Sequence, residues 1–326
     1  HRRQKPPVSL HPARSHYERC STFGPPVLGI ISAMHNTNSL HGASTGVLMA
    51  LAAAVLWGTT GTAQSLAPAG LSPLWVGALR LAIAGVFFAL LVAWAGRGAW
   101  QSLARLSWPH ALLAAVCVAA YNLSFFAGVK AVGVGLGTAV AIGSGPIWAG
   151  LMQTVLQRRW PTPVWWAGTL LGVAGGTLMA LDGAQRMPFN AAGIALCLLA
   201  GLAYSSYALL NQQMVRQVHP GAVNLVVFGG AAVLAVAAAA VLAGPWTLSA
   251  GAWGVMLYLG VVATGVAYLL FSNALRRISG ATGVTLALAE PVTAFVLAIV
   301  VVHEAPSVLA FLGLAGVLAG LGLVIW

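Results

Sequence analysis

Residues 280–304 read GATGVTLALAEPVTAFVLAIVVVHE, an apolar stretch long enough to cross a lipid bilayer as a helix. Glu290 lies ten residues after Gly280, so a rise of about 1.5 Å per residue places it about 15 Å deep. A hydrocarbon core is about 30 Å thick, and Glu290 is therefore expected near its midplane. A carboxylate at that depth costs about 2.5–3.5 kcal/mol, so it is expected to face a cavity or a partner. Because Pro291 removes a backbone donor at the same level, the stretch is typical of a binding site in a transporter.

The composition also predicts an all-α integral membrane protein. The 326 residues are 60% hydrophobic and 6% charged, whereas a soluble protein has about 25% charged residues. The 15 Lys and Arg outnumber the 4 Asp and Glu, but they lie in short loops and in an N-terminal tail, so no nucleic-acid partner is expected. Cys117 and Cys197 lie within apolar segments, and with Cys20 they imply no disulfide framework.

Ten apolar segments separated by short breaks are each predicted to be a transmembrane helix: 44–66, 73–95, 109–128, 134–156, 162–181, 191–212, 221–243, 251–273, 280–302 and 306–326. Residues 1–43 are basic and contain several prolines, and we expect them to form a disordered tail. Met34 is an alternative start, which leaves open whether residues 1–33 belong to the native protein.

The basic residues in the breaks predict the orientation of the chain. With the basic tail inside, the inner loops contain seven arginines: Arg97, Arg105, Arg158, Arg159, Arg216, Arg276 and Arg277. The outer loops contain Lys130 and Arg186. Both termini are therefore expected in the cytoplasm, with the protein in the inner (plasma) membrane.

The two halves of the chain repeat each other. A shift of 147 residues places Gly46, Leu51, Ala53 and Pro73 on Gly193, Leu198, Ala200 and Pro220. A shift of 145 residues places Phe126, Gly135, Pro146 and Pro161 on Phe271, Gly280, Pro291 and Pro306. Five spans is an odd number, so the second repeat (191–326) is predicted to be inverted relative to the first (44–182), with a binding site at their interface.

The run LALAEPVTAFVLAIVVVHEAPSVLAFLGLAGVLAGLGL (286–323) resembles the closing two helices of EamA-type transporters in the drug/metabolite transporter superfamily. Trp57 and the run Leu79-Arg80-Leu81 are also similar to that pattern, and the resemblance covers about residues 44–326. It implies a ten-helix metabolite exporter, with YddG-like amino-acid exporters as the nearest well-defined relatives. The first repeat has Gly145 where the second has Glu290, so a mechanism that needs a symmetric pair of carboxylates is not expected.

Two stripes of polar and aromatic residues are candidates for the lining of a cavity. Trp57, Thr60 and Gln64 share one helical face, and the 147-residue shift relates them to Tyr204, Tyr207 and Asn211. Ordinary hydrogen bonding between helices is the alternative explanation. Further candidates for the same cavity are Arg80, Tyr121, Asn122, Ser144, Trp148, Tyr268, Ser272 and Glu290, with Pro146 and Pro291 as hinges.

These residue types favour a secondary transporter that exports small metabolites, amino acids in particular, by alternating access. A multidrug exporter of hydrophobic cations is the alternative, because aromatic faces and a membrane carboxylate can hold a cation. An intramembrane enzyme is a remote alternative, since the chain has no HExxH or GxxxxGK[ST] motif and no metal or cofactor is expected. The expected partners are a small-molecule substrate and the lipid bilayer. Substrate identity, direction of flux, proton coupling and oligomeric state stay open.

Overall fold

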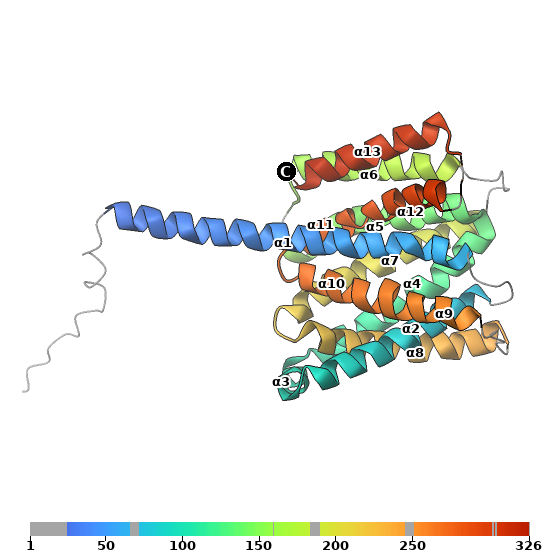
Figure 1. Ribbon diagram of the computed structural model, residues 1–326, viewed down its shortest axis with the longest axis horizontal. Helices are drawn as coiled ribbons and strands as arrows, with labels where there is room; N and C mark the ends of the chain where they lie inside the picture. Colours follow the sequence, from blue (N-terminus) through green and yellow to red (C-terminus); the bar gives the residue numbers. More distant parts are fainter. Residues whose placement is uncertain are drawn as a thin grey trace, which may run out of the picture. The chain divides into compact units, whose positions relative to one another are not determined.

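The computed structural model describes residues 25–65, 72–158, 160–182, 190–244, 251–301, 303 and 305–325. Every regular element in these ranges is helical (Figure 1). Ten segments of the described chain are long and apolar enough to cross a membrane. The all-α fold with ten membrane-spanning helices is therefore confirmed. The expected positions Gln64 (side chain), Arg159, Arg186 and Glu304 lie outside the described residues.

Contacts divide the chain into two units, with the boundary in the sequence between Gly42 and Ala43. The helix α1 (Pro25–Ser65) begins in the first unit and supplies the first span, Gly42–Ala63. Because α1 begins at Pro25, part of the segment expected to be a disordered tail is helical. Residues 1–24 lie outside the described residues.

The remaining helices belong to the second unit. The first repeat continues with α2 (Pro73–Trp94), α3 (Arg97–Ser102), η1 (Leu103–Arg105), α4 (Trp108–Val132), α5 (Val134–Gln157) and α6 (Pro163–Asp182). The second repeat contains α7 (Ala191–Val215), α8 (Pro220–Leu242), α9 (Ala252–Leu257), η2 (Tyr258–Val266), α10 (Ala267–Ala274), α11 (Gly280–Leu286), α12 (Ala289–Val300) and α13 (Val308–Ile325).

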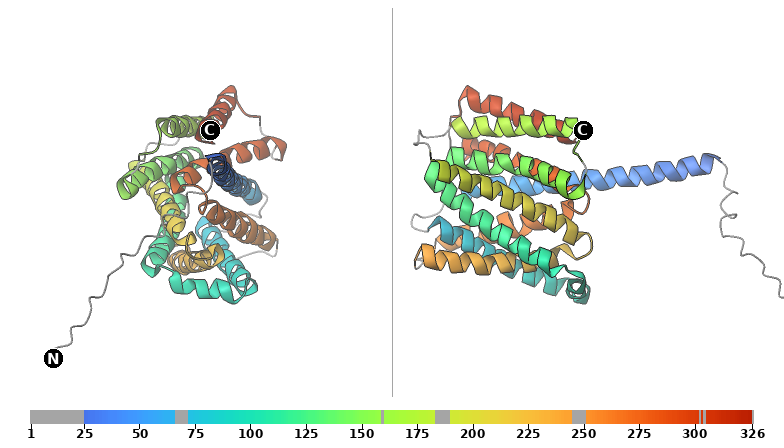
Figure 2. Two further views of the ribbon diagram at one scale, coloured as in Figure 1. Left: turned by 90° about the vertical axis from the view of Figure 1, so that its left-hand side faces the viewer. Right: turned by 180° about the vertical axis from the view of Figure 1, so that it is seen from behind.

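Two helix pairs show how the repeats are related. The second and seventh spans, α2 and α8, pack together, and so do the fifth and tenth, α6 and α13 (Figure 2). Each pair joins a helix with its counterpart in the other repeat, as expected when an approximate two-fold axis relates two inverted repeats. Glycines allow the second pair to approach closely, because a Cβ atom added at Gly168 would lie 2.7 Å from the Gly320 carbonyl oxygen.

The eighth span contains a π-helix, although the sequence predicts one uninterrupted helix over 251–273. η2 occupies its middle, and the Thr264 hydroxyl donates to the carbonyl of Leu259, five residues earlier, at 2.7 Å. Two glycines bring η2 close to α2, since Cβ atoms at Gly260 and Gly265 would lie 2.5 and 2.6 Å from Ile83 and Phe87 side-chain atoms. π-helical turns are frequent at functional sites.

The ninth span is divided between α11 and α12. The division lies at Ala287 and Leu288, just before Glu290 and Pro291. Pro291 has no N–H for the Ala287 carbonyl, and the Glu290 N–H donates to that oxygen instead at 2.9 Å. The ladder thus tightens to a three-residue spacing at the level where the sequence places the missing donor of Pro291.

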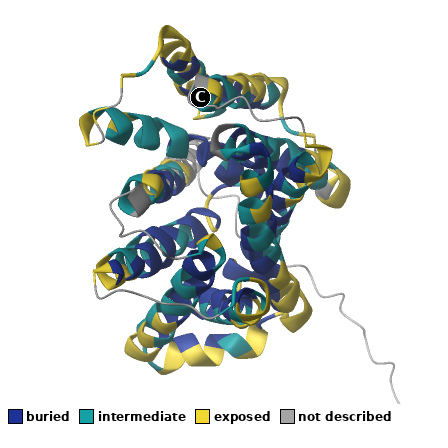
Figure 3. Cartoon of the chain, turned by 90° about the vertical axis from the view of Figure 1, so that its right-hand side faces the viewer, coloured by how far each residue is buried: buried dark blue, intermediate teal, exposed yellow. Residues whose placement is uncertain are grey.

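Burial fits a bundle surrounded by lipid. Buried residues gather where the helices face one another, and exposed ones lie on outward faces and helix ends (Figure 3). Large apolar side chains lie among the exposed residues within the spans, such as Leu48 and Leu90, each 67% exposed, and Val241, 83% exposed. A soluble protein rarely leaves such continuous apolar surface in water, whereas a bilayer solvates it.

Candidate functional site

Four of the aromatic side chains that the sequence predicts to line a cavity lie together, and they come from both repeats. The ring centroid of Trp57 on α1 lies 6.2 Å from that of Tyr204 on α7 and 4.9 Å from that of Tyr268 on α10. Tyr121 on α4 lies 5.8 Å from Tyr204. Phe271 joins at 5.3 Å from Trp57, although the sequence analysis did not single it out. The structure therefore brings together Trp57, Tyr121, Tyr204 and Tyr268 as the aromatic cluster.

The aromatic cluster contains buried polar atoms that lack hydrogen-bond partners among the described residues. They are Trp57 Nε1 and the Tyr204 hydroxyl. A buried polar group left unsatisfied costs about 1–3 kcal/mol, and nearly all such groups in native proteins have a partner. The arrangement is suited to a polar ligand or ordered water that supplies the missing partners.

Arg80 and Asn122 form one hydrogen-bonded pair next to this cluster. The Arg80 Nη2 donates to Asn122 Oδ1 at 3.0 Å, and the Asn122 amide donates to the Val118 carbonyl at 3.1 Å. Arg80 Nε is buried without a partner among the described residues. The Nη2 atom of the guanidinium is thus held by the protein, and the Nε donor remains for an anionic group.

Glu290 lies in the first turn of α12, where the positive end of the helix dipole stabilises a carboxylate. Its carboxylate makes no hydrogen bond or ion pair with any described residue. The carboxylate is nevertheless within electrostatic range of Arg80, Tyr121, Tyr204 and Tyr268. A free carboxylate, a guanidinium and aromatic faces therefore occur in one region.

Three of the predicted lining residues, Tyr207, Asn211 and Ser272, belong instead to a buried hydrogen-bond network. Asn211 Nδ2 donates to the Ser272 hydroxyl at 2.9 Å and to the Tyr207 hydroxyl at 3.1 Å, and Ser272 donates to Asn224 Oδ1 at 2.9 Å. Asn211, Ser272 and Asn224 have no exposed surface. Here the alternative of hydrogen bonding between helices describes Asn211 and Ser272, which tie α7, α8 and α10 together.

The other predicted residues stand apart from these contacts. Ser144 donates to the Ala141 carbonyl on its own helix at 3.3 Å. Trp148 Nε1 is buried without a partner among the described residues, and Thr60 is partly buried. The Thr59 and Tyr258 hydroxyls share a hydrogen bond of 2.7 Å that the sequence analysis missed. Its only sequence signal is a polar residue in each of two apolar spans.

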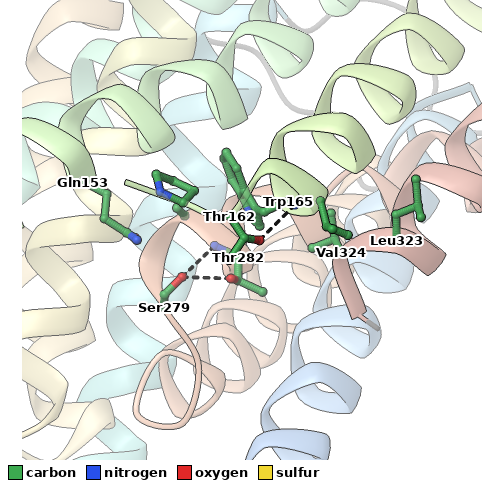
Figure 4. A pocket seen from close by; sticks show the side chains of 10 residues that line it. Gln153, Thr162, Trp165, Ser279, Thr282, Leu323 and Val324 are labelled. Atoms are coloured by element: carbon green, nitrogen blue, oxygen red, sulfur yellow. Dashed lines mark hydrogen bonds between the residues drawn. The ribbon is translucent and has the colours of Figure 1, made fainter. Parts of the chain in front are cut away.

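Described residues of the last two spans of each repeat enclose two cavities. The larger, of about 650 Å³, is lined by α5, α6, α12 and α13 and includes Glu290 and Pro291. The smaller, of about 470 Å³, lies towards the opposite ends of α5 and α6 (Figure 4). There the Ser279 hydroxyl donates to the Thr282 hydroxyl at 2.8 Å, and the backbone N–H of Trp165 donates to the Thr162 hydroxyl at 3.2 Å. Among the described residues, no three His, Cys, Asp or Glu side chains gather to hold a metal.

The two repeats also appear in a comparison with protein families. The EamA-like transporter family matches the chain twice, over residues 44–181 and 191–326. The chain belongs to the EamA-like transporter family. It is therefore a multi-pass membrane protein and a membrane transporter.

Relatives of this EamA-family chain support the same assignment. The uncharacterized transporter YwfM of Bacillus subtilis is 38% identical over 274 residues, which cover 84% of this chain and 91% of that protein. The uncharacterized transporter sll0355 of Synechocystis is 28% identical over 314 residues, covering 90% and 92% of the two chains. A solved crystal structure superposes with a TM-score of 0.75 at 22% identity, over 86% of this chain and 96% of its own, which shows the fold.

Proposed function

We propose that this EamA-family transporter exports small zwitterionic metabolites, amino acids in particular, by alternating access. The observation that carries the proposal is the aromatic cluster with its unsatisfied buried polar atoms, Trp57 Nε1 and the Tyr204 hydroxyl. Because each repeat contributes to the cluster, a movement of one repeat against the other changes which face of the membrane the site is open to.

The two charged residues near the cluster suit the two ends of a zwitterion. Arg80 retains an unpaired Nε donor for a carboxylate, and the Glu290 carboxylate has no described partner and can accept from an ammonium group. No Lys or further Arg accompanies Arg80 among the predicted site residues, and this disfavours phosphorylated substrates. The other predicted residues, Thr60, Ser144 and Trp148, are proposed as peripheral contacts.

The proposal includes an orientation. The inner plasma membrane is the proposed location, with both termini and the arginine-rich loops in the cytoplasm. Glu290 is the residue proposed to couple transport to protons, because a carboxylate within the membrane can exchange a proton during the cycle.

Counterflow in proteoliposomes tests the substrate class. Proteoliposomes that contain the purified protein are loaded with one amino acid. Labelled amino acids and organic cations are then added outside one at a time, and their uptake is measured. We expect amino-acid exchange in the wild type and at least about a tenfold loss in Trp57→Phe and Tyr204→Phe, since one lost hydrogen bond to a charged group is worth about 1.5–3 kcal/mol.

Trp165→Phe is the matched control for this experiment, because it also removes a buried indole N–H without a described partner, outside the aromatic cluster. Its exchange rate should equal that of the wild type. The proposal is contradicted if the folded wild-type protein exchanges no amino acid. It is also contradicted if both Trp57→Phe and Tyr204→Phe exchange amino acids at the wild-type rate.

A further inference from the structure

The larger cavity is mostly apolar and has one charged residue in its described lining. Ile142 on α5, Val173 and Met179 on α6, and Phe295 on α12 form much of its wall. Glu290 is the charged member. Its volume of about 650 Å³ falls within the range of about 300–1,000 Å³ that is usual for sites of small organic ligands.

The cavity extends along α12 from its first turn to the loop that precedes α13. Its lining includes Glu290 at one end and Ala305 and Pro306 in that loop at the other. From Glu290 to Ala298, the last α12 residue in the wall, the helical rise is about 12 Å. The cavity therefore connects one end of the bundle with the level at which Glu290 lies.

The chemistry of this cavity is different from that of the aromatic cluster. None of Trp57, Tyr121, Tyr204 and Tyr268 belongs to its lining, and its other polar side chains are Thr138 and Thr177. The Thr177 hydroxyl already donates to the Val173 carbonyl at 2.8 Å. The Glu290 carboxylate is thus the charged anchor of the described lining, and an anion among apolar walls attracts a cation.

We propose that this cavity is a second binding site, which takes a small organic cation with an apolar body. The positive charge pairs with the Glu290 carboxylate, and the apolar body lies against Ile142, Val173 and Phe295. The site is reached from the end of the bundle at Ala305 and Pro306. This cavity shares the Glu290 carboxylate with the proposed amino-acid site, but its lining excludes the aromatic cluster, so cation binding here is measured without amino-acid transport.

The charge preference of the cavity is measured with a single cysteine at Thr177→Cys, after the three native cysteines are replaced by serine. The thiol is treated with two methanethiosulfonate reagents, one with a trimethylammonium group and one with a sulfonate group. Each rate is divided by the rate at Gly254→Cys, an exposed position where an added Cβ meets nothing within 4 Å. We expect the cationic reagent to be favoured at least about tenfold, and this preference to vanish with Glu290→Gln.

Occupancy is then measured as protection of Thr177→Cys by phenyltrimethylammonium. An added Cβ at Gly176 meets nothing within 4 Å, so Gly176→Leu projects into the cavity without a clash and should abolish protection. Gly322→Leu, at an exposed glycine on α13 with the same free space, should leave it intact. Uncharged tert-butylbenzene, which has the same shape as the cation, should not protect.

Several results would overturn the second site. They are equal rates for the two reagents, no reaction with either, a preference that survives Glu290→Gln, and equal protection by tert-butylbenzene. If Thr177→Cys does not fold, Thr138→Cys on the facing wall of the same cavity gives the same measurement. Labelling reports on the cavity and not on flux, so a failure here is distinguishable from a failure of the proposed amino-acid transport.

Discussion

The two repeats differ at a pair of positions that the internal repeat relates, Gly145–Pro146 and Glu290–Pro291. In the first repeat, α5 continues through Pro146, and Ser205 on α7 donates to the Gly145 carbonyl at 2.6 Å. In the second repeat, the span is divided before Glu290. The residue that faces the Glu290 carbonyl is Gly58, where an added Cβ would lie only 2.5 Å from that oxygen.

Ser205 and Gly58 are themselves counterparts under the 147-residue shift. One repeat therefore satisfies the backbone beside its proline with a side-chain hydroxyl. The other uses a glycine, which lets the backbones of α1 and α12 approach closely. Its own polar group is the Glu290 side chain, which stays free for a ligand. The repeats share a fold, but the carboxylate of Glu290 belongs to the second, whereas the guanidinium of Arg80 belongs to the first.

The close approach at Gly58 gives the largest expected effect. Gly58→Leu places a side chain against the Glu290 carbonyl and against Thr293, whose Cβ would lie 2.6 Å from the new Cβ. The first neighbour is helix backbone and the second is a β-branched side chain, and neither can move away easily. We therefore expect a loss of about 1–3 kcal/mol or more in the free energy of unfolding. Gly61→Leu, three residues later with nothing within 4 Å, should be close to neutral.

Unfolding of both variants in mixed micelles, followed by circular dichroism, measures this difference. Equal stability of Gly58→Leu and Gly61→Leu would mean that α1 and α12 do not meet at this glycine.

Replacement of the two prolines is expected to change the free energy of unfolding by smaller amounts. Pro146 lies inside α5, so Pro146→Ala can restore a helical hydrogen bond and is expected to stabilise the protein by about 1 kcal/mol. Pro291 lies in the first turn of α12, where an N–H is unsatisfied in any helix, so Pro291→Ala should change stability by less than about 0.5 kcal/mol. The same unfolding measurement compares them, and a larger gain from Pro291→Ala would reverse this account of the two repeats.

Much of the fold follows from the sequence because length, hydropathy and repeated prolines are local signals. The ten spans and their grouping into inverted repeats could be predicted in this way. The repeat relates Trp57 to Tyr204 and predicts that both line one cavity, and in the structure their ring centroids lie 6.2 Å apart.

Other features could not be predicted, because they depend on contacts between distant spans. The π-helix η2 has an apolar sequence like that of its neighbours, and its contacts with Ile83 and Phe87 come from another helix. Asn211 and Ser272 have residue types that suit either a substrate cavity or a structural network, and only their mutual hydrogen bond shows the network. The larger cavity is formed mostly by Ala and other common apolar residues, which carry no signal of their own.

The most direct test of the central claim, that Glu290 gives the second repeat its chemistry, is amino-acid flux in proteoliposomes from about pH 5 to about pH 9, a range in which a carboxyl group with a perturbed environment can titrate. The wild type and Glu290→Gln are compared at equal amounts of folded protein, since the amide retains the shape and hydrogen-bonding capacity of the acid. The account predicts a pH-dependent flux in the wild type and a lower flux with a flat profile in Glu290→Gln. Superimposable profiles of the two proteins would contradict it.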